Sequence, residues 1–536
     1  MIAVPFNVSE LKLTDVAVPG FSLIWVLREF LGFVRNEPKL SAPQARRVHR
    51  QPFGRLDLYI PAIIAICFYL LAIWRLPVPN EQVFDEVHHA RTAMEYVDGL
   101  SPHEWSHPPF SKEMMALSLK AWKGEFNPRD GIWTPNQKFE PRSATGWRYP
   151  SVVFGTLTLM ALYALARVLF DSRVVAGASS IILAMDGLFF VQSRIAMTNI
   201  FTVFFITLAA VGVTLFLRRQ QGRWLLLAGV GLGFAIASRW SSLYAWAITV
   251  ALLVAHRLIV SLWPAPMPLF AETAEDTEDT EDDAPAVAED HETARLPKFG
   301  AFLGMSVLGL ILVPFVIYFA TYIPNVLQGP GNLTQKLFTW EGLNNVGWHK
   351  MWTMQYDMFR YHSDLVATHP YDSPWWSWPL ELRPVWYYFD GKNGLISGIW
   401  AIGNVFIWWA SIPAFLTMLY FAWREKGART IIPYCLLAAY GVGQWLAWGV
   451  KARALNFMHY YFECIPFACI ALAYIGWRMW VSPVGSPATL LLRRLFVVGY
   501  ATALVGWFIF YYPLLSAYPI SEWYYGQHLW LGRSWV

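Results

Sequence analysis

Residues 196–217 read AMTNIFTVFFITLAAVGVTLFL, a stretch without a charged side chain that is followed directly by Arg218 and Arg219. About 20 consecutive apolar residues suffice for a helix to cross the hydrocarbon core of a bilayer. Basic residues that follow such a helix favour the cytoplasmic side. The stretch therefore predicts a membrane-spanning helix whose C-terminal end faces the cytoplasm.

Ten further segments have the same character, although two breaks between neighbours rest only on Ser193-Arg194 and Ser238-Arg239. Their approximate bounds are 57–75, 149–170, 174–192, 224–238, 240–262, 299–321, 395–422, 431–450, 455–478 and 494–513. The composition agrees, because 15% charged residues is well below the roughly one quarter that is usual in soluble domains. We therefore predict an all-α polytopic membrane protein with about 11 transmembrane helices. No nucleic-acid partner is expected, because no basic stripe with a nucleic-acid motif is present.

Basic residues also set the predicted orientation. Arg46, Arg47 and Arg50 precede the first span, which predicts a cytoplasmic N-terminus; an odd number of spans then places the long loops 76–148 and 322–394 outside. The predicted organisation is a cytoplasmic segment with an interfacial helix (1–56), a transmembrane catalytic module (57–260), a disordered acidic cytoplasmic loop (261–298), a second transmembrane module (299–513) and an extracytoplasmic tail (514–536). The acidic run 271–292 carries too little apolar surface to fold alone, and binding to a basic partner stays open.

A pair of carboxylates stands just beyond the first predicted span, in FDEVHHARTAMEY (84–96). Asp85 and Glu86 could simply stabilise a helix N-terminus. Asp85, His88 and His89 could also share a helical face and bind a metal such as Zn²⁺, but a third strong ligand is not evident, and we predict no metal site. The favoured interpretation is a catalytic base, because a partly desolvated carboxylate near a membrane surface can be tuned for proton abstraction.

Basic side chains near this pair suggest an anion site. His107 precedes the stiff Pro108-Pro109 pair, Lys112 follows in the same loop, and Arg148 lies at the mouth of the second span. A planar guanidinium suits phosphate oxygens, although a rigid turn at His107 and snorkelling of each basic residue remain the plain alternatives. Arg194 and Arg239 lie at outer helix ends, where positive charge is not favoured. Both therefore need a partner, which an anion in an outward-facing cavity would supply.

The second outer loop is rich in aromatic residues. Residues 348–389 read WHKMWTMQYDMFRYHSDLVATHPYDSPWWSWPLELRPVWYYF. Interfacial packing explains any single tryptophan there, and a lid or sugar stacking are the alternatives. The histidines and acids of the loop favour a cover over a polar cavity.

These motifs together resemble one known family. The matching stretches are FDEVHHA with Tyr96 after it, SHPPFSK, GWRYPSVVFGTL, AMDGLFFVQSRIAMTNIF, ASRWSSLYA, THPYDSPWWSWPLELRPVWYY, IGNVFIWW and LWLGRSWV. Their order, from about residue 84 to the end, is similar to the protein O-mannosyltransferases, polytopic glycosyltransferases of the GT-C type, and to the bacterial branch without a MIR domain. The chain departs from the family pattern at Asn199, where an acid is usual, at Val405, where Pro is usual, and at Phe110-Ser111, where Leu-Gly is usual.

The resemblance implies an inverting transfer of mannose from polyprenyl phosphate mannose to Ser or Thr hydroxyls of secreted or membrane proteins. It implies Asp85 as the base, Glu86 as a group that orients the acceptor or Asp85, and no cofactor. The implied phosphate ligands are Arg148, Lys112, His107, Arg194 and Arg239. The implied acceptor or sugar ligands are Tyr96, His369, Asp372, Trp375, Trp376 and Arg383.

The implied setting is a multi-pass protein of the cell membrane with an extracytoplasmic active site. Its expected partners are the lipid-linked donor, Ser/Thr-containing secretory polypeptides and the bilayer, with the protein translocation machinery as a further candidate. Two alternatives remain. One is another GT-C polyprenyl-phosphate-sugar transferase with a lipid or glycan acceptor, and the other is a transporter or scaffold, for which Asp85 would be dispensable.

Overall fold

The computed structural model describes residues 51–122, 124–127, 132–135, 143–262, 297–324, 347–424, 431–450, 455–482, 486–530 and 532. Most of the predicted N-terminal segment and the acidic run 271–292 lie outside these residues. Within them, nine helices are long and apolar enough to cross a membrane. They are α3 (Leu56–Ile73), α6 (Thr145–Phe170), α9 (Asn199–Arg219), α11 (Ser242–Leu262), Phe299–Thr321 (α12, a π-helical turn and α13), α17 (Val405–Arg424), α18 (Ile431–Val450), Met458–Val481 (a 3-10 turn and α19) and α20 (Pro487–Leu515).

Two shorter apolar helices, α7 (Arg173–Ala184) and α10 (Gly222–Ser238), correspond to the remaining predicted spans. The breaks expected at Ser193-Arg194 and Ser238-Arg239 are present, because α8 (Gly187–Gln192) ends before Ser193 and α10 ends at Ser238. The helical class is confirmed, whereas the count of 11 membrane crossings stays a prediction.

The predicted start of the span at residue 395 is wrong. Leu395–Ala401 is strand β4, which pairs with β3 (Val385–Lys392) and with β5 (Ile520–Ser521) in a small antiparallel sheet. A second pair, β1 (Gly124–Asn127) and β2 (Ile132–Pro135), lies between α5 (Phe110–Ala121) and α6 in the sequence. A short apolar run such as LISGIWA does not distinguish a buried strand from a helix. Pairing with β3 and β5 shows that this run is a strand.

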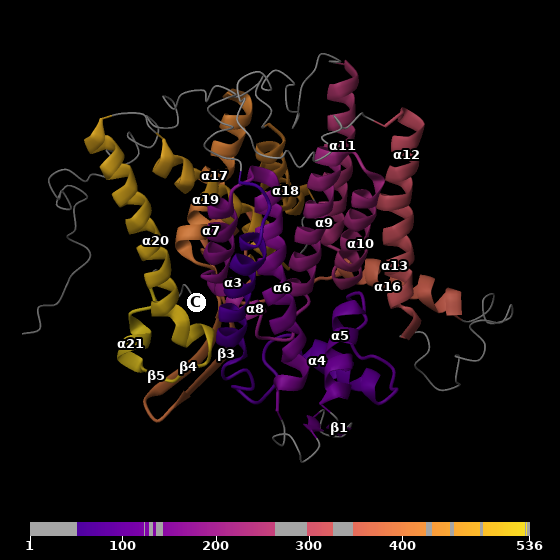
Figure 1. Ribbon diagram of the computed structural model, residues 1–536. Helices are drawn as coiled ribbons and strands as arrows, with labels where there is room; N and C mark the ends of the chain where they lie inside the picture. The colour runs from indigo at the N-terminus through magenta and orange to yellow at the C-terminus, as the bar shows by residue number, and fades with distance from the viewer. Residues whose placement is uncertain are drawn as a thin grey trace, which may run out of the picture.

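The elements outside the long helices gather at one end of the bundle. Helices α4 (Glu86–Val97) and α5 (Phe110–Ala121), strand β1 and the three-stranded sheet all lie at the lower end in Figure 1, with α16 (Gly347–Asp364) near the same level. The two long loops therefore meet at a common end, where they can build one site.

Helices α9 and α10 pack backbone against backbone. A Cβ added to Gly212 would lie 2.6 Å from the nitrogen of Ala228, and one added to Gly231 would lie 2.8 Å from the nitrogen of Ala209. Small residues allow this close approach between membrane helices. The pairs fix the antiparallel register of the two helices along their length.

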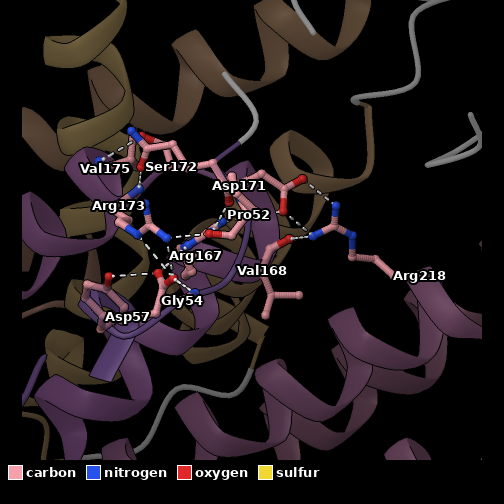
Figure 2. Close-up of polar contacts among 12 residues, drawn as sticks. Pro52, Gly54, Asp57, Arg167, Val168, Asp171, Ser172, Arg173, Val175 and Arg218 are labelled. Carbon is pink, nitrogen blue, oxygen red and sulfur yellow. Dashed lines mark hydrogen bonds and ion pairs between the residues drawn. The ribbon is translucent and has the colours of Figure 1, made fainter. Parts of the chain in front are cut away.

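The opposite end of α6 carries a cluster of charged residues (Figure 2). Asp57 accepts hydrogen bonds from Arg167 at 2.6 Å and from Arg173 at 2.9 Å, while Asp171 pairs with Arg218 at 2.5 Å. These contacts tie the start of α3, the turn between α6 and α7 and the end of α9. Because α6 has 26 residues, the cluster lies about 39 Å from the α4 end.

Candidate active site

The chain enters the site through a strained backbone. Phe84 has a positive φ of 49°, a conformation that costs a non-glycine residue about 1–3 kcal/mol and persists only where packing enforces it. Its ring stacks on Tyr387 at 4.4 Å between centroids and meets Phe457 edge-on at 6.3 Å. The packing of Phe84 fixes the direction of the next residue, Asp85.

Asp85 holds the N-cap position of α4, yet its side chain makes no capping hydrogen bond. A capping carboxylate would accept from a backbone N–H in the first turn, and the carboxylate of Asp85 accepts no such bond; only its backbone carbonyl accepts, from His88 and His89, each at 3.0 Å. The geometry does not support the helix-cap interpretation. The carboxylate instead lines a cavity of about 440 Å³.

This cavity brings together residues that lie far apart in the sequence, in 84–107, 197–199, 239, 361–369 and 455–460. Of the residues predicted from sequence, Asp85, His107, Arg239 and His369 line it. Further lining residues are His88, His103, Glu104, Asn199, Tyr361, Phe457, His459 and Tyr460. Both long loops thus contribute to one hollow, together with the start of α9, Arg239 after α10 and the start of the helix that follows residue 457.

The surroundings tune Asp85 as a base. Burial raises its pKa above the ordinary value of 3.8, and Glu104 adds to the rise, while the nearby His107, His88 and Arg239 oppose it. A carboxylate with a raised pKa is a stronger proton acceptor than an exposed one. Asp85 is therefore suited to take a proton from a bound alcohol.

Glu86 points the other way, into the protein. Its side chain is fully buried and accepts hydrogen bonds from the backbone N–H groups of Val83 at 3.0 Å and Ala196 at 2.8 Å. Arg148 donates to both carboxylate oxygens, from Nε at 2.9 Å and from Nη2 at 2.8 Å. Glu86 therefore does not reach the cavity, and its contacts hold the loop that carries Asp85.

Arg148 has no donor left for a phosphate in this arrangement. Besides Glu86, its guanidinium donates to the carbonyls of Leu76 at 3.1 Å, Pro79 at 2.8 Å and Glu81 at 2.8 Å. The side chain is 1% exposed. The structure places it in the scaffold and not on the cavity wall.

Lys112 is engaged in the same manner. Its ammonium forms a short ion pair with Glu104 and donates to the carbonyls of Glu104 at 3.0 Å and His107 at 2.8 Å. Glu104 also accepts from Ser106 at 2.6 Å and lies 3.1 Å from Nδ1 of His107. Burial acts to raise the pKa of Glu104, but Lys112 and His107 hold it well below its usual range. Glu104 therefore stays ionised and orients the imidazole of His107, whose ring lines the cavity.

The two arginines at helix ends differ. Arg194 donates to the backbone carbonyls of Ala72 at 2.5 Å and Trp74 at 2.7 Å, so it closes the end of α3. Arg239 lines the cavity, and its guanidinium lies over the ring of Tyr460 at 4.3 Å. Among the predicted phosphate ligands, Arg239 and His107 are the two on the cavity wall.

The predicted acceptor or sugar ligands lie in different surroundings. Asp372 accepts from the backbone N–H of Asn456 at 2.7 Å, and Arg383 donates to the carbonyl of Pro370 at 2.7 Å. Trp375 packs edge-on against Trp445, Trp376 is 55% exposed, and Tyr96 is buried in the core. None of these five lines the cavity, whereas His369 does.

The stretch HEWSH (103–107) matches HExxH, a zinc pattern when both histidines share a helix face. Here residues 101–109 are not helical, and Glu104 is bound to Lys112 and His107. Within the described part of the chain, no group of three or more potential ligands is arranged to hold a metal ion.

Two family models match the chain. The model described as dolichyl-phosphate-mannose-protein mannosyltransferase matches residues 62–328, and that described as the C-terminal four TMM region of protein-O-mannosyltransferase matches residues 347–535. The chain belongs to the protein O-mannosyltransferase family. The family predicted from the sequence motifs is thereby confirmed.

Relatives of this O-mannosyltransferase align along nearly its whole length. The polyprenol-phosphate-mannose–protein mannosyltransferase of Mycolicibacterium smegmatis is 25% identical over 93% of this chain and 96% of the relative. The protein of the same description from Corynebacterium glutamicum is 25% identical over 90% and 94%. The solved Pmt1-Pmt2 complex of Saccharomyces cerevisiae bound to the sugar donor has a TM-score of 0.69 at 15% identity, covering 92% of this chain and 94% of that chain. This last likeness confirms the predicted fold.

Sequence reasoning did not single out several cavity residues of this O-mannosyltransferase. Glu104 lies just before the motif SHPPFSK, and its place between two histidines and ahead of a lysine was the available signal. Phe457, His459 and Tyr460 had no such signal, because an aromatic helix start is also typical of packing. The segment that carries them is joined to the second loop where the backbone N–H of Asn456 donates to Asp372.

Proposed function

We propose that this protein transfers mannose from polyprenyl phosphate mannose to Ser or Thr hydroxyls of polypeptides, with Asp85 as the catalytic base. The observation that carries the proposal is the position of Asp85, whose carboxylate lines a cavity without a capping hydrogen bond. The relatives named polyprenol-phosphate-mannose–protein mannosyltransferases support the donor and the protein acceptor.

The chemistry is a single displacement. The hydroxyl oxygen of the acceptor attacks C1 of the mannose while its proton passes to the Asp85 carboxylate. The bond between C1 and the phosphate oxygen breaks, and its electron pair leaves with the phosphate. Inversion then converts a β-linked donor into an α-mannoside and releases polyprenyl phosphate.

Charge develops on the leaving phosphate, so a fixed cation nearby stabilises the transition state more than the ground state. Arg239 and His107 line the same cavity as Asp85 and can serve this purpose. Glu86 and Arg148 do not line the cavity and act indirectly, because their buried ion pair holds the loop before α4 in place. His369 from the second loop is the candidate for contact with the acceptor or sugar.

The positive-inside pattern supports a site on the extracytoplasmic face of the cell membrane. Trp376 belongs to the second long loop and is exposed. A cysteine placed at position 376 should react in intact cells with a membrane-impermeant maleimide. Labelling only after permeabilisation would place this loop in the cytoplasm.

The central experiment is reconstitution in liposomes with labelled polyprenyl phosphate mannose and a Ser/Thr-rich peptide. We expect label on the peptide as α-linked mannose, and no label on a peptide whose Ser and Thr are replaced by Ala. Asp85→Asn should abolish transfer without loss of folded protein. Transfer to a lipid or glycan but not to the peptide would contradict the proposed acceptor, and near-normal transfer by Asp85→Asn would remove Asp85 from the mechanism.

A further inference from the structure

The turn between α9 and α10 lies at the end of the bundle away from the cavity. Helix α9 begins at Asn199, which lines the cavity, and its 21 residues extend over about 31 Å to Arg219. Gln220 then adopts a left-handed φ of 54°, and α10 begins at Gly222. Because this length matches the hydrocarbon core of a bilayer, the turn lies at the level of the lipid headgroups on the side of the membrane opposite the cavity.

The basic residues of this turn differ in their partners. Arg218 donates from its two terminal nitrogens to both carboxylate oxygens of Asp171, at 3.0 and 2.5 Å (Figure 2). The second acid of that cluster, Asp57, is bound by two other arginines. Arg219 and Arg223 are exposed, and within the described part of the chain neither takes part in an ion pair or a hydrogen bond. The acids of this end are therefore occupied, and two positive charges are left over.

Trp224 brings these two charges together. The guanidinium carbon of Arg219 lies 5.6 Å from the centroid of its ring, and that of Arg223 lies 5.0 Å from the same ring. Cation–π contacts of this kind orient a guanidinium group, and groups held in place before binding lose less freedom when a ligand arrives. The indole nitrogen Nε1 is enclosed and has no hydrogen-bond partner among the described residues. An enclosed donor of this kind calls for an explanation.

The turn is also held firmly from behind. A Cβ added to Gly222 would lie 2.5 Å from the sulfur of Met305 in α12, and one added to Gly229 would lie 1.8 Å from the carbonyl oxygen of Gly309. Such close approach is typical of small residues between membrane helices. Helix α10 is therefore packed directly on the span that contains α12, and the fold fixes where the two arginines are presented.

We infer that Arg219, Arg223 and Trp224 form a binding site for the phosphate group of an anionic phospholipid in the adjoining leaflet. Guanidinium groups suit phosphate oxygens, tryptophan is favoured at headgroup level, and the indole N–H can donate to an oxygen held between the arginines. Snorkelling accounts for two exposed arginines, but not for their shared ring or for the indole N–H without a partner. The inference does not depend on the proposed function.

The double variant Arg219→Gln/Arg223→Gln tests the site. It removes both charges and breaks no ion pair or hydrogen bond among the described residues, so the melting temperature without lipid should not change. Each arginine near a charged membrane surface contributes about fivefold to binding, so the double variant should bind an anionic lipid about thirtyfold more weakly. Arg494→Gln is the matched control, because Arg494 lies over Trp480 at 5.3 Å as a single guanidinium and also donates to the carbonyl of Trp480 at 3.4 Å.

Binding is measured on the purified full chain in detergent, by thermal stabilisation during titration with short-chain phosphatidylglycerol. Phosphatidylcholine with the same chains is the comparison lipid, because its ammonium group neutralises the phosphate. Glycerol 3-phosphate presents the phosphate without chains and separates a lipid site from a site for a soluble phosphate. We expect phosphatidylglycerol to stabilise the protein at concentrations at which neither comparison compound acts, and Arg494→Gln to leave this response unchanged.

Single variants keep the test decisive if the double variant does not fold. Arg219→Gln and Arg223→Gln should each weaken phosphatidylglycerol binding about fivefold, and Trp224→Phe, which keeps a ring but removes the N–H, should weaken it about threefold. The inference is overturned if the arginine variants bind phosphatidylglycerol as the unmodified protein does, which would place the lipid elsewhere, for example in the cavity. It is also overturned if phosphatidylcholine or glycerol 3-phosphate stabilises equally well, or if Arg494→Gln has the same effect as the double variant.

Discussion

The adjacent acids Asp85 and Glu86 should respond in opposite ways to loss of charge. Glu86→Gln keeps the size of the side chain but removes the counter-ion of Arg148, which is 1% exposed and donates to both carboxylate oxygens. The new amide nitrogen would also face donors, because Val83 and Ala196 present N–H groups to the same oxygens. Every native contact of this carboxylate is therefore weakened.

Removal of one partner of a buried ion pair costs about 3–5 kcal/mol. We expect Glu86→Gln to lose stability of this order and to lose transfer activity at all donor concentrations, since the loop that carries Asp85 loses its anchor. Asp85→Asn loses no capping bond, and burial already disfavours its charge. Its melting temperature should be equal or higher, while transfer falls by about 10²–10⁴-fold, the usual contribution of a general base.

The assay compares both variants in the same detergent, by thermal unfolding and by transfer from labelled polyprenyl phosphate mannose to peptide. Activity is expressed per folded molecule, so that loss of protein is not counted as loss of chemistry. An Asp85→Asn protein that unfolds as easily as Glu86→Gln would refute a functional carboxylate at 85. A Glu86→Gln protein of unchanged stability, with a raised KM for peptide, would show that Glu86 contacts the acceptor.

Three further outcomes follow from the charges near the site. Lys112→Ala should lower stability and kcat with little change in donor KM, because Lys112 holds Glu104 and not the phosphate; a selective rise in donor KM would contradict this. Burial raises the pKa of the Glu113 carboxyl from its ordinary value of 4.5 to about 8. The folded state therefore loses stability relative to the unfolded state as the pH rises from 4.5 towards 8. Glu113→Gln should stabilise the protein by up to about 3 kcal/mol at pH 7 but should have no such effect below pH 4.5. The value of kcat/KM should fall as pH drops through the raised pKa of Asp85, above the range of an exposed aspartate; an acidic limb at or below pH 3.8 would argue against a buried base.

The sequence predicted the helices better than the partners of charged residues. Among the described residues, apolar length alone located every helix that is long and apolar enough to cross a membrane, because a bilayer imposes that length; it did not locate α16, which is long but polar. It placed a helix over Leu395–Ala401 because apolarity does not reveal β pairing, and the partner strand β5 lies more than 100 residues later. Asp85 was accessible to sequence reasoning because an acid next to a span is unusual.

The roles of Arg148 and Lys112 were not accessible in that way. Both have the chemistry of a phosphate ligand, but Glu86 and Glu104 neutralise them inside the fold. Glu86 is 62 positions from Arg148, so no local pattern relates them. Residue type shows which ligand a side chain could bind, and only the tertiary structure shows which partner it already has.

The glycine contacts between α9 and α10 have a consequence for the reaction. Gly212 and Gly231 lie within the hydrocarbon-length part of the bundle, and neither leaves room for one added methyl group. A side chain at either position would push α9 and α10 apart. Arg239, which follows α10 and lines the cavity, would then shift relative to the start of α9. A substitution within the membrane-spanning part of the bundle, distant from the reacting sugar, would then weaken binding of the lipid-linked donor.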